Sequence, residues 1–490
     1  MKLRAVCILG AALAVNCQGL RAAERYQATW ESLKTHKDPK WFDEAKFGIY
    51  FHWGVYSVPA FGTEWYSRNM YRPGSKENKH HLEKWGPLDK FGYKDFIPMF
   101  KAEKFDPDDW ARLFVASGAK FAGPVAEHAD GFAMWDSQVT EWNAAKMGPK
   151  RDIVGELERA IRKQGLKFIT TLHHQWLWAW YPTFDKSVDA SAPKYAGLYG
   201  PVVSEGAWKY TAKDELIPSA EFCRRWEAKI GEVVDKYHPD LLWFDSRMGN
   251  IGEEYRKRFL AHYYNQAAER KRDVAVTYKN HDLEPGAGIV DLERGRMAKI
   301  TPYKWLNDDS IDWNSWCYIE NPDYKSADRL VDGLVDIVSK NGNLLLNINP
   351  RPDGTIPEPT RERLLEIGKW LKLNGEAIYG TKPWEIFGEG PTQVVEGHFG
   401  ERKIKDFTSA DIRFTRKGNA LYAIILDWPA GPVRIESLRQ DRAPWFGQIR
   451  RIEMLGVRKP LQWSRDRQGL TVQMPAVKPC EYAFVLKITG

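Results

Sequence analysis

Ionisable side chains stand at the ends of the short apolar runs of this 490-residue chain. They are His52, His128, His173, His174, Asp245, Lys279 and Glu293. Burying a charged group without a partner is costly, so packing alone does not explain this repeated placement. Asp245 and Glu293 could act as the carboxylate pair of a glycoside hydrolase. One would attack or stabilise the anomeric carbon, and the other would protonate the leaving oxygen.

Each of these residues also has a purely structural interpretation. Asp245, followed by Ser246, could cap the N-terminus of a helix, and Glu293 could form a surface ion pair with Arg294 or Arg296. A single histidine at a strand end is more often a core residue, but histidines on three strands favour recognition of hydroxyl groups. Tryptophans near the same ends would supply the apolar faces on which sugar rings pack. They are Trp53, Trp65, Trp135, Trp142, Trp176, Trp178, Trp180, Trp243, Trp305, Trp313 and Trp316.

Metal-dependent hydrolysis is an alternative chemistry, because barrel hydrolases that use a metal also carry histidines and an aspartate at strand ends. The first strand should then offer closely spaced histidines, whereas "YFHWG" contains only His52. The last run, "LLLNINP", contains no carboxylate. We therefore predict a site without a metal. The sequence has no G-x-S-x-G motif, which argues against an α/β-hydrolase.

The elements that must position these residues alternate between strands and helices. Apolar runs predict buried parallel strands over 46–54, 119–128, 166–174, 239–246, 273–280, 288–295 and 342–350. Amphipathic stretches predict helices over 109–117, 153–164, 219–237, 253–270 and 326–340. This alternation predicts an α/β fold, a (β/α)₈ barrel over 24–375, in which the strand ends share one face. An open doubly wound sheet is the alternative, although no G-x-G-x-x-G or Walker loop supports it.

The remainder of the chain predicts a small C-terminal β-sandwich over 376–490. A last helical pattern covers 362–373, and beyond it helical periodicity disappears. Short strands are predicted at 392–399, 411–428, 447–456, 470–475 and 481–488, with Lys417-Gly418-Asn419 as a hairpin turn.

The N-terminal residues 1–23 predict a signal peptide, and hence export to the periplasm or the extracellular space. They combine two early basic residues, an apolar run too short to cross a bilayer and small residues at Ala22-Ala23. A lipid anchor at Cys17 is an alternative that Asn16 disfavours. No later run has transmembrane length. The net charge of +7 is scattered and does not indicate a nucleic-acid partner.

Four blocks of sequence resemble family 29 glycoside hydrolases, the α-L-fucosidases. They are "WFDEAKFGIYFHWGVYSVPAFGTEWYSRNMY" (41–71), "HADGFAMWDSQVTEWN" (128–143), "HPDLLWFDS" (238–246) and "NGNLLLNINPRPDGTIP" (341–357). The resemblance covers the whole predicted barrel. It implies a retaining, cofactor-free double displacement on terminal α-L-fucose, with fucosylated oligosaccharides or glycoconjugates as substrates.

The resemblance also implies roles for individual residues. Asp245 falls on the nucleophile of the family's W-x-D motif. Positions that hold the fucose hydroxyls and ring match His52, Glu64, Trp65 and Trp243, and Trp316 matches an aromatic residue near the sugar. His128 matches the first histidine of the family's K-H-H-D-G-F block and is a further predicted substrate-binding residue. Glu293 is the predicted acid/base, and Glu284 is the alternative because this position varies within the family.

One block departs from the family pattern. The family's K-H-H-D-G-F is Glu127-His128-Ala129-Asp130-Gly131-Phe132 here, so the lysine and the second histidine are missing. Either the sugar pocket is altered, or His173, His174 or Lys279 compensates. A glycan-binding protein that has lost turnover on the same scaffold is therefore the second hypothesis, although Asp245 and Glu293 are both present.

Overall fold

A closed barrel of eight parallel strands forms the main body of the protein, which confirms the predicted fold class. The computed structural model describes residues 25–442 and 447–490, so the predicted signal peptide and Cys17 lie outside the described residues. The barrel strands are β1 (Phe47–Phe51), β2 (Phe121–Glu127), β3 (Lys167–Leu172), β4 (Leu241–Phe244), β5 (Ala275–Tyr278), β6 (Ile289–Asp291), β7 (Trp305–Ser310) and β8 (Gly342–Ile348). β1 pairs with both β2 and β8 and closes the barrel.

One barrel strand, β7, has no counterpart among the predicted strands. Its sequence, "WLNDDS", is mostly polar, yet every residue in it is buried. Charged partners replace apolar ones: Asp308 lies 3.4 Å from the Lys279 ammonium, and Asp309 lies 2.5 Å from that of Lys325. Alternation of apolar residues therefore cannot identify this strand.

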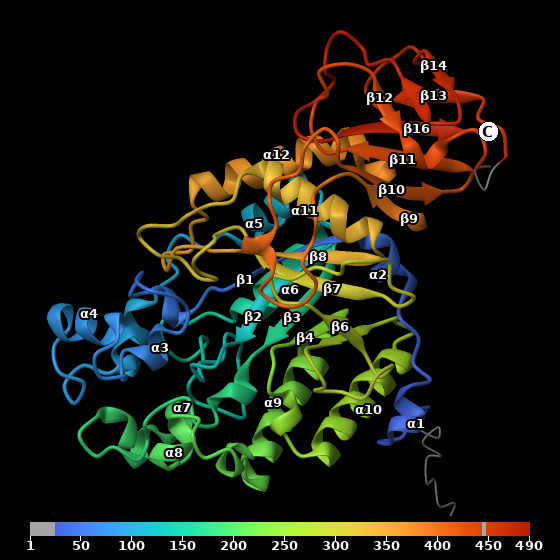
Figure 1. Ribbon diagram of the computed structural model, residues 1–490. Coiled ribbons are helices and arrows are strands. Elements are labelled where there is room, and N and C mark those ends of the chain that lie inside the picture. Colours follow the sequence, from blue (N-terminus) through green and yellow to red (C-terminus); the bar gives the residue numbers. More distant parts are fainter. Residues whose placement is uncertain (1–24, 443–446) are drawn as a thin grey trace, which may run out of the picture.

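Helices surround the barrel, as Figure 1 shows, and the long ones match the predicted helices closely. The long helices are α5 (Pro107–Ala116), α6 (Ile153–Lys163), α9 (Ala220–Tyr237), α10 (Glu253–Glu269), α11 (Ala327–Ser339) and α12 (Glu358–Asn374). Short helices are α1 (Trp30–Leu33), α2 (Lys40–Ala45), α3 (Tyr66–Asn69), α4 (Lys76–Lys84), α7 (Ala196–Tyr199) and α8 (Glu205–Trp208). Side-chain caps fix where several begin; Ser219, for example, accepts a hydrogen bond from the Phe222 amide at the start of α9.

Two antiparallel sheets form the C-terminal domain, as predicted. One sheet has the strand order β13-β16-β11-β10-β9 and the other β12-β15-β14. The strands are β9 (Lys382–Glu389), β10 (Ile412–Lys417), β11 (Ala420–Ile425), β12 (Val433–Ile435), β13 (Arg451–Met454), β14 (Trp463–Arg465), β15 (Leu470–Val472) and β16 (Phe484–Thr489). Apolar side chains from both sheets share one core. The predicted strand 392–399 is wrong, because this segment is irregular and lies in the connection between β9 and β10.

Helices α11 and α12 lie between the barrel and the C-terminal sheets (Figure 1). A buried ion pair joins the two parts, since the Arg413 guanidinium of β10 donates to Asp336 of α11 at 2.7 Å. The Trp370 indole of α12 donates to the Ala483 carbonyl at 2.7 Å. The two parts therefore share polar as well as apolar contacts.

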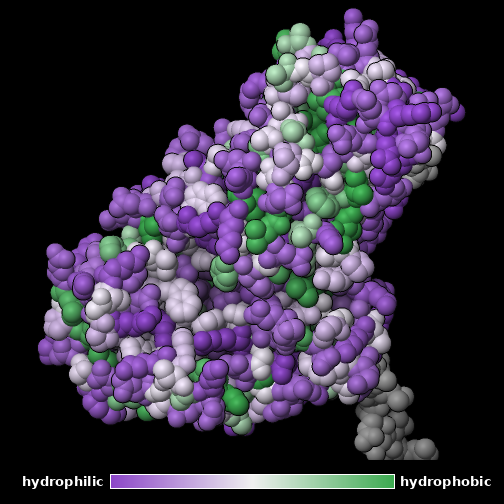
Figure 2. Space-filling model, viewed as in Figure 1, coloured by the Kyte–Doolittle hydropathy of each residue, from purple (hydrophilic) through white to green (hydrophobic). Residues whose placement is uncertain are grey.

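The surface seen in Figure 2 is mostly hydrophilic, and its hydrophobic residues form small separate groups. Among residues 25–442 and 447–490, no helix combines the length and the apolar character needed to cross a membrane.

Candidate active site

A cavity of about 710 Å³ opens at the carboxyl ends of the barrel strands. All the predicted site residues except His174 line it, namely His52, Glu64, Trp65, His128, His173, Trp243, Asp245, Lys279, Glu293 and Trp316. The barrel therefore brings together residues that are more than 200 positions apart in the sequence, such as His52 and Lys279, as their places at strand ends predict.

Lys279 forms the centre of a group of carboxylates in this cavity. Its ammonium group lies 3.2 Å from Oδ1 of Asp245, 2.7 Å from Oε2 of Glu293 and 3.4 Å from Oδ2 of Asp308. Burial alone would lower the pKa of Lys279, but Asp308, Glu293 and the other carboxylates raise it well above its ordinary value. The lysine is therefore a permanent cation that holds Asp245 and Glu293 on the same side of the cavity.

The separation of the two predicted catalytic carboxyls follows from this shared contact. Their oxygens cannot be farther apart than the sum of the two lysine distances, about 6 Å, which is the scale of retaining rather than inverting glycosidases. Burial raises the pKa of Glu293 to about 7; Lys279 opposes the rise, and the Asp308 and Asp245 carboxylates add to it. Glu293 can therefore carry a proton near neutral pH.

Sharp turns follow two of these strand-end residues. Asn280, after Lys279, has φ 53°, and Arg294, after Glu293, has φ 43°. Residues other than glycine seldom adopt this left-handed conformation, and functional sites are enriched in it. The chain thus turns away directly after the residue whose side chain enters the cavity.

Three histidines line the part of the cavity next to Trp243. The nearest ring nitrogens of His52, His128 and His173 lie within 4.8 Å of one another. Burial lowers the pKa of His52 to about 3 and lowers those of His128 and His173 well below the ordinary value, so all three rings are neutral. The His52 ring bonds the Asn347 side chain at 2.8 Å, whereas Nδ1 of His128 and of His173 has no hydrogen-bond partner.

This histidine trio can serve two kinds of ligand. Neutral imidazoles each offer one donor and one acceptor, which suits sugar hydroxyls. Their spacing would also allow one transition-metal ion to contact all three nitrogens. The absence of a metal therefore stays a prediction, and a chelation experiment below tests it.

Contacts from other elements surround the residues of the "EHAD" block that depart from the family pattern. Glu127 is fully buried and pairs with Lys229 of α9 at 2.5 Å, so its charge is compensated where the family pattern has a lysine. Of the residues that could replace the missing second histidine, His173 lies beside His128, with ring centroids 4.6 Å apart. Lys279 is instead held by carboxylates, and His174 lies outside the cavity. Of the three candidates, His173 is therefore the one whose position beside His128 fits the missing histidine.

Two sequence candidates lie away from the cavity. The His174 ring stacks on Trp226, with centroids 5.8 Å apart, and its Nε2 bonds the Trp226 carbonyl. Glu284 is half-exposed and pairs with Lys34 at 3.1 Å. The geometry therefore favours Glu293 over Glu284 as the acid/base.

Sequence reasoning missed several residues that line the cavity. Tyr50 and Asp308 are two of them, and the buried tyrosine hydroxyl donates to the aspartate at 3.1 Å. The connection between β9 and β10 contributes His398, Phe399, Glu401 and Arg402. No local signal marks the connection, because its role depends on contact with residues about a hundred positions earlier, such as Glu293.

Comparison with known proteins identifies the family of the chain. Residues 13–376 match the α-L-fucosidase family, and residues 405–489 match the α-L-fucosidase C-terminal domain. The tissue α-L-fucosidase of Homo sapiens is 34% identical over 98% of this chain and 95% of its own length. That of Bos taurus is 33% identical over 100% of this chain and 97% of its own.

Solved structures show the same similarity in three dimensions. The crystal structure of Thermotoga maritima α-fucosidase in complex with fucose has a TM-score of 0.76 and 32% sequence identity. The match covers 94% of this chain and 100% of that chain. The chain therefore belongs to the α-L-fucosidase family of glycoside hydrolases.

Proposed function

We propose that this α-L-fucosidase removes terminal α-L-fucose from fucosylated oligosaccharides or glycoconjugates, with Asp245 as nucleophile and Glu293 as acid/base. The observation that carries these roles is the Lys279 ammonium, which contacts both carboxylates in one cavity. In the first step Asp245 bonds to the anomeric carbon, the bond to the leaving oxygen breaks, and Glu293 gives that oxygen its proton. In the second step Glu293 takes a proton from water, which attacks the anomeric carbon and releases Asp245.

The stereochemistry of the first product tests this function. We expect hydrolysis of an aryl α-L-fucoside, followed by NMR, to yield α-L-fucose before mutarotation, because two inversions restore the configuration. Release of β-L-fucose first would contradict the double displacement. A protein that only binds glycans would release no phenol. Fucosylated oligosaccharides of defined linkage would then identify the aglycone.

The histidine trio provides a prediction about binding. We expect His52→Ala or His128→Ala to lose about 1 to 3 kcal/mol of transition-state stabilisation, the cost of a missing buried polar partner. Ratios of kcat/KM on an aryl fucoside measure this loss. His262→Ala is the matched control, since this histidine pairs with Asp235 on the outside of the barrel and should keep the wild-type rate.

Chelation decides between sugar and metal at the same three histidines. We expect activity to survive dialysis against a strong chelator, because neutral imidazoles bind hydroxyl groups without an ion. Inactivation that a divalent ion reverses would instead assign a metal to His52, His128 and His173.

Lys279 provides a prediction about pH. Its ammonium lowers the pKa of Glu293, so Lys279→Met should raise that pKa and move the alkaline limb of the rate profile to higher pH. We also expect a loss of about 1.5 to 3 kcal/mol in transition-state stabilisation, since charged hydrogen bonds disappear. Lys279→Arg keeps the cation, so its alkaline limb should lie close to the pH of the wild-type limb. An unmoved limb in a folded Lys279→Met variant would contradict this electrostatic role.

We also propose export, on the composition of residues 1–23. Mass spectrometry of the mature protein tests it: cleavage after Ala23 supports a signal peptide, and a lipid-modified Cys17 at the new N-terminus supports the anchor. An unprocessed N-terminus would contradict both.

A further inference from the structure

A segment of the β9–β10 connection lies across one wall of the active-site cavity. We call residues 397–402 the strap; their sequence is Gly-His-Phe-Gly-Glu-Arg. They belong to the chain beyond β9, yet His398, Phe399, Glu401 and Arg402 line the cavity together with residues from the barrel strands. The strap is therefore part of the active site, although it comes from the C-terminal part of the chain.

Two hydrogen bonds attach the strap directly to the backbone of Glu293. The Phe399 amide donates to the Glu293 carbonyl at 2.8 Å, and the Glu293 amide donates to Nδ1 of His398 at 3.1 Å. Because Nδ1 accepts this bond, the ring proton must lie on Nε2. Burial and the nearby Lys279 lower the pKa of His398, which keeps Nδ1 free to accept.

The pairing continues on both sides of this contact. The Glu401 amide donates to the Arg294 carbonyl at 3.1 Å, and the Gly397 amide donates to that of Arg296 at 3.0 Å. A Cβ atom on Gly295 would lie only 2.2 Å from the Gly397 carbonyl oxygen. The close approach of the two segments therefore requires glycine at position 295.

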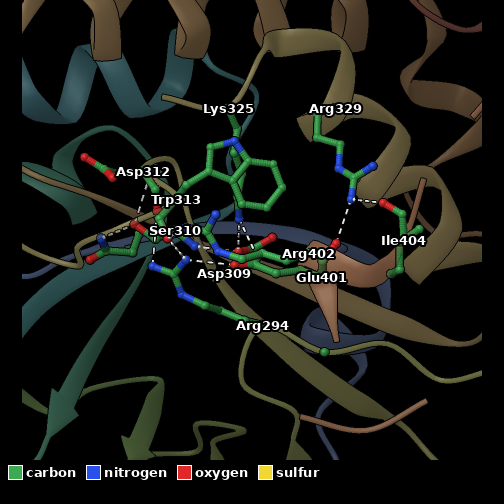
Figure 3. Close-up of polar contacts among 12 residues, drawn as sticks. Arg294, Asp309, Ser310, Asp312, Trp313, Lys325, Arg329, Glu401, Arg402 and Ile404 are labelled. Carbon is green, nitrogen blue, oxygen red and sulfur yellow. Dashed lines mark hydrogen bonds and ion pairs between the residues drawn. The ribbon is translucent and has the colours of Figure 1, made fainter. Parts of the chain in front are cut away.

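Charged side chains hold the strap in place, as Figure 3 shows. Glu401 accepts from the Arg294 guanidinium at 2.8 Å and from the Lys325 ammonium at 2.5 Å. The Arg402 guanidinium donates to the Trp313 carbonyl at 2.6 Å (Figure 3). It also donates to the Asn314 side chain at 2.9 Å. These anchors lie on the loops that follow β6 and β7, so the strap is fixed to the catalytic face of the barrel.

Phe399 is the large apolar residue of the strap. It is 61% exposed, and its backbone has φ 55°. A large apolar side chain in this conformation is unusual, and strain of this kind is concentrated at functional sites. The strap thus presents an aromatic ring to solvent at the cavity wall, while the residues on either side of the ring are fixed.

We propose that the strap forms the subsite for the sugar to which fucose is attached, with Phe399 as its stacking surface. The inference rests on the proposed function, in which Glu293 protonates the leaving oxygen. The acid must stand on the side of the leaving sugar, and the strap is bonded to the backbone of that acid. The expected occupant is a pyranose whose apolar face can pack on an aromatic ring.

The test compares two substrates that share fucose and differ in the leaving group. α-L-Fucosyl fluoride has no aglycone ring, whereas a fucosyl disaccharide has one. We expect Phe399→Ala to lower kcat/KM on the disaccharide about 10-fold more than on the fluoride, the change that corresponds to one stacking contact. Phe399→Trp should restore the ratio, because it restores an aromatic face.

A control variant and the contrary outcomes complete this test. Tyr303→Ala removes another exposed aromatic residue, which is 52% exposed and does not line the cavity, and should leave the ratio unchanged. Equal losses of Phe399→Ala on both substrates, or no loss on either, would overturn the proposal. If the wild-type chain released no fluoride at all, the proposed function itself would be wrong, and the subsite proposal that rests on it would be wrong too.

Transfer to an acceptor sugar gives a second measurement on the same variants. A subsite for the leaving sugar also holds the acceptor when the glycosyl-enzyme reacts with a sugar instead of water. We expect Phe399→Ala to lower the ratio of transfer to hydrolysis at a fixed acceptor concentration. An unchanged ratio would contradict a stacking role.

Discussion

Asp245→Gly is expected to abolish hydrolysis of fucosides while leaving the fold intact. Asp245 directly follows β4 (Leu241–Phe244), lines the cavity and contacts Lys279 at 3.2 Å, so the substitution removes the group that attacks the anomeric carbon. The loss should be on the order of 10⁴-fold or more, as for other covalent nucleophiles. Rates on an aryl α-L-fucoside measure it, and circular dichroism checks the fold.

Azide should restore the release of an activated leaving group from the same variant. A small anion can enter the space of the missing carboxylate and attack the face that Asp245 attacks, which gives β-L-fucosyl azide. Asp214→Gly, an exposed aspartate outside the cavity, is the control and should behave like wild type with or without azide. Near wild-type turnover of Asp245→Gly would remove Asp245 from the mechanism.

Most of the fold could be predicted because hydrophobic burial leaves a pattern in the sequence. The sequence predicts a helix over 219–237, and α9 covers Ala220–Tyr237 with Ser219 as its cap. Strand β7 could not be predicted, because its buried aspartates are stabilised by Lys279 and Lys325 rather than by apolar packing. Those partners come from other parts of the chain, and a local window does not contain them.

The candidate site was predictable where topology alone places a residue. Parallel strands in a barrel bring their carboxyl ends together, so Asp245, Lys279 and Glu293 had to share a face. Adjacent residues point in different directions, and only the structure distinguishes His173, in the cavity, from His174, packed on Trp226. The strap could not be predicted, because its place in the site depends on a contact between Glu293 and His398, which are 105 residues apart. No local sequence pattern encodes such a contact.

Removal of the Glu293 carboxyl should slow hydrolysis according to the leaving group. Glu293→Ala is expected to lose roughly 10²- to 10⁴-fold on natural oligosaccharides, whose leaving oxygen needs a proton. An activated aryl fucoside needs little protonation, so its first step should suffer much less. The acid must be protonated to act, and the pKa of Glu293 is about 7. The wild-type rate on oligosaccharides should therefore fall as pH rises through about 7, and Glu293→Ala should lose that limb.

Glu284→Ala separates this assignment from its alternative. Glu284 is half-exposed and bound to Lys34 outside the cavity, so its removal should change neither the leaving-group dependence nor the alkaline limb. A nearby buried acid, Glu64, also has a pKa that burial raises to about 7, so the pH profile alone does not assign the limb. The leaving-group comparison assigns the alkaline limb, because the dependence on the leaving group belongs to the acid that protonates the leaving oxygen. Glu293 shares Lys279 with the nucleophile, whereas Glu64 accepts a hydrogen bond from the Trp316 amide. If Glu293→Ala hydrolyses oligosaccharides normally and Glu284→Ala shows the leaving-group dependence, the acid/base is Glu284.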